Sequence, residues 1–442
     1  MHARTRLILA VLTLALPLGA QDLREQIAGM AAKELDSLEQ LYRQLHANPE
    51  LSFYEKETAA RLVAQLQRLG FTVTPDVGGH GFVAVLKNGS GPTVMVRTDL
   101  DALPVVENTG RPYASDRRTK DDQGNDVGVM HACGHDIHMT SFVGTARVLA
   151  ALKDRWSGTL VMIGQPAEER GAGARAMLDD GLFERFPRPD YVLGLHVSAN
   201  LEAGRVGYHA GFAMASVDSV DVTIRGVGGH GAYPHYTKDP VVIAAQVILA
   251  LQTIVSREVP PIEAGVVTVG SIHGGTKHNI IPDEVKLQLT VRSYSDETRQ
   301  KILDAIERIT VGIARAAGVP PEREPTIQQA TAEHTPALYN DPGLVELMAP
   351  VWQALLGEKQ VVPVDAEMGG EDFARYGRQE PKTPIFMFRV GTIDAERMAA
   401  SQRPGGPPLP SLHSALFWPA PRPAIETGVK AMSAAVLELM GK

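Results

Sequence analysis

The sequence predicts an α/β protein that carries a second, inserted unit of strands and helices, and three observations lead to this prediction. Short apolar runs that end in polar residues alternate with helical stretches, which is typical of a sheet covered by helices on both faces. Residues 214–329 show a separate succession of predicted strands and helices. At 442 residues, the chain is also long enough for two cores. We therefore expect one domain from residues 21–213 plus 330–442, interrupted by another from residues 214–329.

The composition is that of a globular protein, with 44% hydrophobic and 21% charged residues. The formal net charge of −8 and the scattered basic residues argue against a nucleic-acid partner.

The first 20 residues have the pattern of an export signal. Arg4 and Arg6 precede an apolar run over residues 7–18, and Gly19 and Ala20 provide the small residues of a cleavage site. The alternative is an uncleaved anchor, although the run is too short to span a bilayer comfortably. We predict cleavage after Ala20, a periplasmic or secreted protein, and no stable membrane association afterwards.

The elements of the first unit follow in order along the chain. Helical periodicity predicts helices over residues 22–46, 56–69, 138–152 and 342–356. The apolar runs "TVMVR", "TLVMIGQP", "YVLGLHV" and "PIFMFRVG" predict strands of a covered sheet. In such sheets ligands bind beyond the carboxyl ends of the strands. Five polar residues fall there, namely Asp99, Asp101, Glu168, Glu169 and His196.

The inserted unit has its own order of elements. Its segments "SVDSVDVTIRG", "DPVVIAAQVILALQTIVS", "AGVVTVGSIHG", "EVKLQLTVRSY", the helix closed by Gly318, and "EREPTIQQA" read as β-α-β-β-α-β. This order predicts a ferredoxin-like arrangement.

The stretch "HACGHDIH" contains Cys133, the one cysteine of the chain, which therefore has no disulfide partner within the chain. Cys133 and His135 are two residues apart, so on a loop both side chains can turn toward one metal ion. Thiolate and imidazole together suit zinc or another late divalent ion. His131 and His138 can equally be structural residues.

Glu168 and Glu169 directly follow an apolar strand, where adjacent carboxylates repel unless a positive charge lies beside them. One can bind metal while the other acts as a general base, which must be free to hold a proton. A lone histidine in an apolar run, such as His196, is usually structural, but within this constellation it is a candidate ligand. His413 follows a Pro/Gly-rich segment that can hold it over the crevice. A cysteine hydrolase that uses Cys133 would leave these residues without a role.

The motifs "RTDLDALP", "MHACGHDIH", "QPAEE", "GLHV", "GGHGAYPH", "NIIPDEV", "GGEDF" and "LHS" occur together and in order. They resemble the di-metal amidohydrolase branch of the aminoacylase and carboxypeptidase G2 metallopeptidase superfamily. This branch contains hippurate hydrolases, N-acyl-amino-acid amidohydrolases and plant indole-acetyl-amino-acid hydrolases. The resemblance covers about residues 30–440 and implies a zinc-peptidase-like catalytic domain with an inserted lid and dimerisation domain.

The resemblance implies two divalent metal ions per subunit, zinc or manganese first, with cobalt or nickel as further candidates. Cys133 would be the bridging ligand and Glu168 the general base, while Asp101 and Asp136 would orient the ligands. The metal ligands implied are Cys133, His135, Glu169, His196 and His413.

The resemblance also implies a homodimer, in which His230 of one subunit polarises the scissile carbonyl in the site of the other. Asn279 would contact the substrate, and Arg292 is a candidate for binding the carboxylate of the product. Compared with the family pattern, the chain departs at Ile137, Gly164 and Gly370, and we expect these positions near the lining of the site.

The expected activity is metal-dependent hydrolysis of the amide bond of N-acyl amino acids, including hippurate-like and other acyl or aryl-acyl conjugates. A dipeptidase or carboxypeptidase of the same superfamily is the alternative. A non-catalytic binding protein would be expected to lack some of the ligands, yet all five stand in the sequence.

Overall fold

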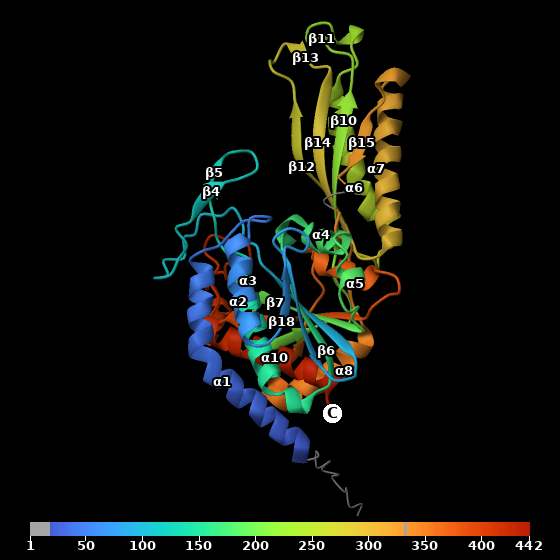
Figure 1. The fold of residues 1–442 in the computed structure, drawn as a ribbon. Helices are drawn as coiled ribbons and strands as arrows, with labels where there is room; N and C mark the ends of the chain where they lie inside the picture. Colours follow the sequence, from blue (N-terminus) through green and yellow to red (C-terminus); the bar gives the residue numbers. More distant parts are fainter. Residues whose placement is uncertain (1–17, 331–333) are drawn as a thin grey trace, which may run out of the picture.

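The computed structural model describes residues 18–330 and 334–442, which form two units, one broad and one elongated (Figure 1). The broad unit is built on an eight-stranded sheet in the order β1-β2-β6-β3-β7-β18-β8-β17. The central strands β6, β3, β7 and β18 are parallel to one another. The strands are β1 (Thr72–Pro75), β2 (Phe82–Asn88), β3 (Thr93–Asp99), β6 (Gly158–Gln165), β7 (Tyr191–Glu202), β8 (Val206–Tyr208), β17 (Val361–Pro363) and β18 (Ile385–Ile393).

Both faces of this sheet are buried, and the residues of each central strand divide between two apolar cores. In β6, Leu160 and Met162 belong to one core, whereas Val161 and Ile163 belong to the other. This division explains why the strands are continuous apolar runs rather than alternating ones, and the predicted α/β class is confirmed.

Helices cover the two faces unequally. The larger core lies beneath α1 (Leu18–His46), α2 (Lys56–Arg68), α3 (His135–Ala151), α8 (Pro342–Leu356) and α10 (Pro421–Met440). The smaller core lies beneath α4 (Gly173–Asp179), α5 (Leu182–Arg185) and the 3-10 turn Asp372–Arg378. The hairpin of β4 (Arg118–Lys120) and β5 (Asp126–Gly128) and the helix α9 (Ala395–Ser401) lie outside these layers.

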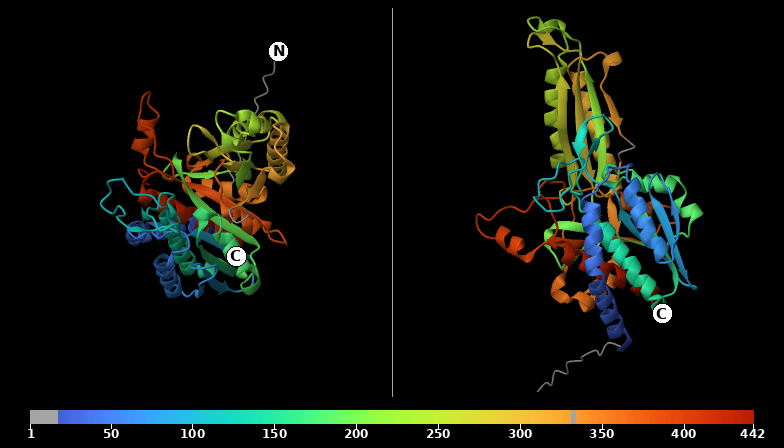
Figure 2. Two further views of the ribbon diagram at one scale, coloured as in Figure 1. Left: turned by 90° about the horizontal axis from the view of Figure 1, so that it is seen from above. Right: turned by 60° about the vertical axis from the view of Figure 1, so that its left-hand side comes forward.

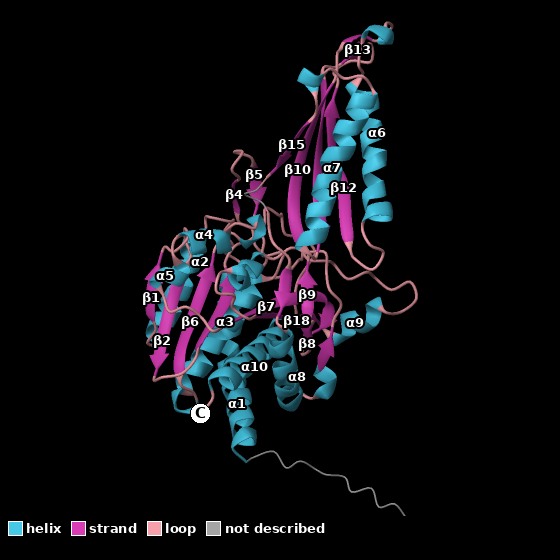
Figure 3. Ribbon diagram, turned by 90° about the vertical axis from the view of Figure 1, so that its right-hand side faces the viewer, coloured by secondary structure: helices cyan, strands magenta, loops and turns pink. Residues whose placement is uncertain are grey.

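The elongated unit stands over the broad one in the right-hand view of Figure 2 and in Figure 3. Its antiparallel sheet has the order β12-β14-β10-β15, and its helices α6 and α7 pack on one face around a core of their own. Its elements are β10 (Ser216–Arg225), α6 (Pro240–Thr253), β12 (Gly265–Gly274), β14 (Glu284–Ser293), α7 (Asp296–Ala316) and β15 (Thr326–Gln329). This is the predicted order β-α-β-β-α-β.

The chain enters and leaves the elongated unit at one place. Strand β9 (Gly211–Met214) precedes it, β16 (Leu338–Asn340) follows it, and these two strands pair antiparallel. At the far tip, β11 (Gly229–His230) pairs with β13 (Ile280–Ile281). The connection to the broad unit is therefore a narrow one.

Two helices begin several residues earlier than the sequence predicts. The first helix begins at Leu18 rather than residue 22, so it includes the end of the predicted signal, whose residues 1–17 lie outside the described part of the chain. Helix α3 begins at His135 rather than residue 138, because Gly134 takes a left-handed conformation (φ 76°) that turns the chain directly into the helix. His135 thus becomes the first residue of α3.

Gly144 allows α3 to pack closely against α1 and α10. A Cβ atom at this position would lie 2.4 Å from Val429 Cγ2 and 2.9 Å from Leu38 Cδ1. We expect Gly144→Ala to lower the free energy of unfolding by about 1–3 kcal/mol, since overpacking outweighs the helix propensity of alanine. In urea unfolding, the double variant Gly144→Ala/Val429→Ala should lose less stability than the sum of the two single variants. A stabilised Gly144→Ala protein would contradict the close packing.

Candidate metal centre

The five predicted metal ligands converge at the carboxyl end of the eight-stranded sheet. Cys133 Sγ lies 3.6 Å from His196 Nε2 and 3.3 Å from His413 Nε2. Glu169 lies opposite, with Oε2 3.4 Å from His413 Nε2 and Oε1 3.7 Å from His135 Nε2. The donors form two triplets that share the thiol, Cys133–His135–His196 and Cys133–Glu169–His413, and within each triplet the donor atoms are less than 4.8 Å apart.

Hydrogen bonds to backbone oxygens fix the orientations of two imidazole rings. His135 Nδ1 lies 2.8 Å from the backbone oxygen of Asp101, and His196 Nδ1 lies 2.8 Å from that of Val197. A carbonyl oxygen can only accept a hydrogen bond, so each Nδ1 carries the proton. Each Nε2 therefore faces the cluster, and in the neutral ring it offers its lone pair there, as a metal ion requires.

Unsatisfied polar atoms indicate that a cation belongs in this cluster. Among the described residues, His135 Nε2 and Glu169 Oε1 are buried and have no hydrogen-bond partner. Leaving such atoms unpaired costs free energy that a coordinated ion would recover. Soft sulfur, three imidazoles and a carboxylate suit zinc and its neighbours, so these residues fit the two divalent ions that the resemblance implies.

The electrostatics of the cluster agree with this conclusion. Burial and the carboxylates of Glu169 and Glu168 raise the pKa of the Cys133 thiol well above its usual range. Burial lowers the pKa of His135, but Asp99, Asp101 and Glu169 outweigh it and raise this pKa to about 10. The site thus favours added positive charge, and a bound cation would hold Cys133 as the thiolate.

Strained loops place several of these residues. His413 has a left-handed backbone (φ 65°), and its N–H donates to the backbone oxygen of Ala132 at 2.9 Å, beside Cys133. Ala167, just before the two glutamates, is also left-handed (φ 48°). Non-glycine residues in this conformation cost free energy and tend to occur at functional sites.

Glu168 is buried beside the cluster, with Oε2 3.8 Å from His135 Nε2. Burial and the nearby carboxylates of Glu371 and Glu169 raise the pKa of Glu168 well above its usual range. A raised pKa suits a group that takes up and returns a proton.

Of the two aspartates predicted to orient ligands, one contacts them and the other does not. Asp101 Oδ2 accepts a hydrogen bond from the Glu169 N–H at 3.0 Å, and Oδ1 lies 3.5 Å from His135 Nδ1. Asp136 Oδ2 instead lies 2.6 Å from Nδ1 of His46, whose Nε2 lies 3.1 Å from Glu107 Oε1. Burial lowers the pKa of His46, but the two carboxylates outweigh it and raise this pKa to about 9. Asp136 therefore joins α3 to α1 through His46, which also contacts the loop that carries Glu107.

The sequence analysis missed the role of Arg97 and left that of His138 open. Arg97, fully buried in β3, donates to Asp99, Glu371 and Asp372 at 2.7, 2.9 and 3.3 Å. His138 Nδ1 lies 2.8 Å from Asp99 Oδ1, and its Nε2 accepts from the Val197 N–H at 2.9 Å. The sequence feature that could have identified Arg97 is a single cationic residue within an apolar strand.

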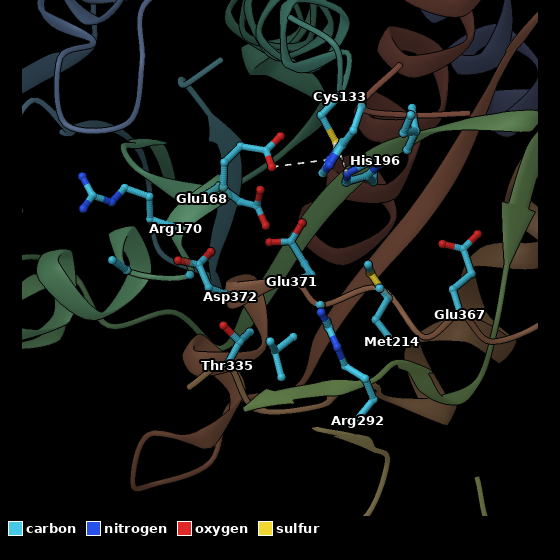
Figure 4. Close-up of a pocket in the computed structure, with 18 of the residues that line it drawn as sticks. Cys133, Glu168, Arg170, His196, Met214, Arg292, Thr335, Glu367, Glu371 and Asp372 are labelled. Atoms are coloured by element: carbon cyan, nitrogen blue, oxygen red, sulfur yellow. Dashed lines mark hydrogen bonds and ion pairs between the residues drawn. The ribbon is translucent and has the colours of Figure 1, made fainter. Parts of the chain in front are cut away.

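A cavity of about 880 Å³ opens beside the cluster, and both units line it (Figure 4). Cys133, Glu168 and His196 line it from the broad unit, and Arg292 of β14 lines it from the elongated unit. Arg292, predicted to bind the product carboxylate, is thus brought to the site.

Two other predicted residues lie elsewhere within the chain. His230 is in β11 and Asn279 just precedes β13, at the tip of the elongated unit, and both are exposed. The backbone oxygen of Asn279 accepts a hydrogen bond from the Gly231 N–H at 2.9 Å. The fold therefore holds these two residues side by side but apart from the cavity of their own chain.

The positions that depart from the family pattern do not all lie at the site. Gly370 lines the cavity, as expected. Ile137 instead belongs to the larger core, and a side chain at Gly164 would collide with the ring of Phe82, which fills that space. The expectation was wrong for Ile137 and Gly164.

Comparisons with known proteins agree with this geometry. The sequence profile of "Peptidase family M20/M25/M40" matches residues 95–403. The chain is 39% identical to a hippurate hydrolase of Campylobacter jejuni (73% of this chain, 79% of the relative). It is 37% identical to an N-acetyl-L-cysteine deacetylase of Bacillus subtilis (80% of each). Its fold matches a dinuclear metal-binding peptidase of the M20 family from Bacillus subtilis with a TM-score of 0.73 at 28% identity (92% of this chain, 99% of that one).

The ligand set predicts which variants lose metal. Cys133→Ala and His196→Ala should each bind zinc or manganese at least about 100-fold more weakly than the wild type, since each removes a donor atom from the cluster. Metal content per chain, measured by elemental analysis after gel filtration, tests this expectation. The matched control is Glu168→Gln, which lies in the same cavity but should keep its metal. Full metal content in both ligand variants would contradict the assignment.

Proposed function

The chain belongs to peptidase family M20/M25/M40 and is a hydrolase of that family, and from this premise we propose that it cleaves the amide bond of N-acyl amino acids. The observation that carries the proposal is the convergence of five donor side chains beside the buried carboxyl of Glu168, in a cavity that also contains an arginine. Relatives named hippurate hydrolase and N-acetyl-L-cysteine deacetylase support this substrate class.

The proposed metal ligands are Cys133, His135, Glu169, His196 and His413, holding two divalent ions. When bound, such ions supply a water of lowered pKa and polarise the substrate carbonyl. The thiol shared by the two donor triplets supports Cys133 as the bridging ligand. Zinc and manganese are the first candidates, with cobalt and nickel next.

Glu168 is the proposed general base. Its carboxyl adjoins the ligand His135 without belonging to either triplet that contains the thiol. It takes the proton of the attacking water and then delivers that proton to the leaving nitrogen as the carbon–nitrogen bond breaks.

Arg292 is the proposed partner of the amino acid carboxylate. Its guanidinium is half-buried at the cavity wall, and burial lowers its pKa from the usual value. A substrate carboxylate would form an ion pair with this arginine, and the planar guanidinium can bind it through two hydrogen bonds.

A dipeptidase or carboxypeptidase activity is the second candidate, because the same donors and base would serve a peptide bond. The cavity is lined by Glu371, Asp372 and Glu367 as well as by arginines, so it can also receive a substrate with a free ammonium group. Rates on hippurate, N-acetyl amino acids and dipeptides distinguish the two activities.

We further propose a homodimer formed through the elongated unit. Helix α6 packs one face on its sheet but exposes apolar side chains on the other, including Val242 (54% exposed) and Leu249 (73% exposed). The segment Pro240–Glu258 is long and apolar enough to cross a membrane by length and composition alone, and burial against a second copy is the alternative that we favour. In such a dimer His230 and Asn279 would complete the cavity of the partner subunit.

The proposed location is the periplasm or the extracellular space, following removal of residues 1–20. Its support is the charged and apolar pattern of that segment in the sequence.

Replacement of the proposed base should separate catalysis from metal binding. Glu168→Gln should lower kcat for hippurate by about 100- to 10,000-fold, because the variant can no longer transfer the proton. Its metal content should equal that of the wild type. A Glu168→Gln enzyme with most of its kcat would refute this role.

A mixing experiment tests the proposed exchange of His230 between subunits. Homodimers of Cys133→Ala and of His230→Ala should each be nearly inactive. When the two proteins are mixed and allowed to exchange subunits, half of the dimers carry one intact site, so activity should return to about a quarter of wild type.

The control for the mixing experiment is Leu249→Glu, which places a charge on the exposed face of α6. It should sediment as a monomer and abolish the recovery. No recovery from a mixture shown to exchange subunits would contradict the role of His230 in the partner's site.

A further inference from the structure

Glu371 is a carboxylate in the cavity wall to which the proposed reaction assigns no role. Its residue is 1% exposed, it lines the cavity, and it lies in one group with Glu168 and Asp372, whose carboxylate oxygens are all within 4.8 Å of one another. Figure 4 shows its carboxylate between Glu168 and Arg292. This position lies between the proposed base and the proposed carboxylate-binding arginine.

The two oxygens of Glu371 have different surroundings. Oε1 accepts hydrogen bonds from Arg97 Nη2 at 2.9 Å and from the Phe373 N–H at 3.0 Å. Oε2 is buried and has no hydrogen-bond partner among the described residues. One end of the carboxylate is therefore anchored, and the other end is left without a donor.

The neighbouring Asp372, whose side chain belongs to the same group of carboxylates, has no unpaired oxygen of this kind. Asp372 Oδ1 accepts from Gln165 Nε2 at 2.6 Å, and its Oδ2 accepts from the Ala174 N–H at 2.9 Å. Both of its oxygens are thus satisfied within the chain. A buried acceptor without a donor is costly, so Glu371 Oε2 is suited to a donor on a ligand.

We propose that Glu371 Oε2 accepts a hydrogen bond from the N–H of the scissile amide and holds the leaving amine, an inference that rests on the proposed function. The amide nitrogen is bonded on one side to the carbonyl carbon attacked beside Glu168. On its other side it is bonded to the carbon that carries the carboxylate held by Arg292. The chain next to Glu371 borders that arginine, since a Cβ atom at Gly370 would lie 3.6 Å from Arg292 Nη1.

The proton balance is consistent with this role. Water adds its oxygen to the carbonyl carbon, Glu168 passes the proton of that water to the nitrogen, and the carbon–nitrogen bond breaks. The proton originally on the amide nitrogen stays there, so its hydrogen bond to Glu371 persists from substrate to amine product. An ester has no such proton, and its bridging oxygen would face the lone pair of Glu371, so this carboxylate selects amides over esters.

Glu371→Gln exchanges the acceptor for a donor at nearly constant shape. Arg97 Nη2 and the Phe373 N–H both donate to the Oε1 position, so the glutamine oxygen will occupy that position. Its NH₂ group then faces the cavity, where it opposes an amide N–H but can donate to an ester oxygen.

The experiment compares kcat/KM for hippurate and for its ester counterpart, O-benzoylglycolate, on metal-loaded enzyme. Glu371→Gln should lower the value for hippurate by about 10- to 100-fold, the effect of one hydrogen bond to a charged group. The value for the ester should fall much less, because the ester lacks this hydrogen bond, so that the ratio of amide to ester hydrolysis falls by about 10-fold or more. Metal content should match the wild type.

The matched control is Glu367→Gln, which makes the same chemical change in the same cavity. The Glu367 side chain is 49% exposed and lies 3.1 Å from Arg389 Nη2, so its replacement should leave the ratio of amide to ester hydrolysis unchanged. A second measurement uses the wild type alone. N-benzoylsarcosine, in which a methyl group replaces the amide proton, should be hydrolysed at least about 10-fold more slowly than hippurate.

Equal losses on amide and ester in Glu371→Gln would overturn the inference, because they would indicate a general electrostatic or structural effect. If that variant does not fold, similar wild-type rates on hippurate and N-benzoylsarcosine would overturn it as well. A wild-type enzyme that hydrolyses esters and dipeptides but no N-acyl amino acid would instead refute the proposed function.

Discussion

Buried negative charge at the carboxyl end of the eight-stranded sheet is the constraint on which the site depends. Asp99, Asp101, Glu168, Glu371 and Asp372 are all buried there. Carboxylates can remain buried only when cations or donors compensate them. Arg97 does so for one half of the group, through its bonds to Asp99, Glu371 and Asp372. In the half nearest Cys133, Asp101 and Glu169 face the imidazole of His135 at 3.5 and 3.7 Å, and there the metal ions would supply further positive charge.

The rigidity of the broad unit makes this division of charge possible. Strands buried on both faces cannot shift to bring new partners to an unpaired carboxylate. Left-handed backbone conformations at Gly134, Ala167 and His413 then bring the proposed metal-ligand side chains of three separate loops to one point. The strain at Ala167 and His413 is held by the surrounding fold, and the result is a set of donors positioned before any ion arrives.

The sequence predicted those parts of the site that lie next to recognisable strand ends, and the fold class for the same reason. Cys133, Glu169 and His196 could be grouped because each stands beside an apolar run or in a short motif. Arg97 could not be assigned, since its partner Glu371 lies 274 residues away and no local pattern links them. The resemblance implied that Asp136 orients a metal ligand, but its side chain on α3 turns to His46 instead, and no local sequence pattern records that direction. The placement of His230 at a distant tip likewise depends on strand pairing that no motif records.

In the proposed reaction, the division of the cavity between two units separates chemistry from recognition. The metal donors and Glu168 belong to the broad unit, whereas Arg292, Val217 and Ser219 line the cavity from the elongated one. The two units have separate apolar cores and are joined where β9 pairs with β16. A change in the angle at this junction would move Arg292 relative to Glu168 while leaving every donor distance intact. Glu371 lies on the broad unit beside that boundary, so in the proposed reaction it can hold the amide nitrogen whichever substrate carboxylate Arg292 binds. On this proposal, substrate preference can change through the elongated unit alone, without disturbance of the buried charges beside the proposed metal ligands.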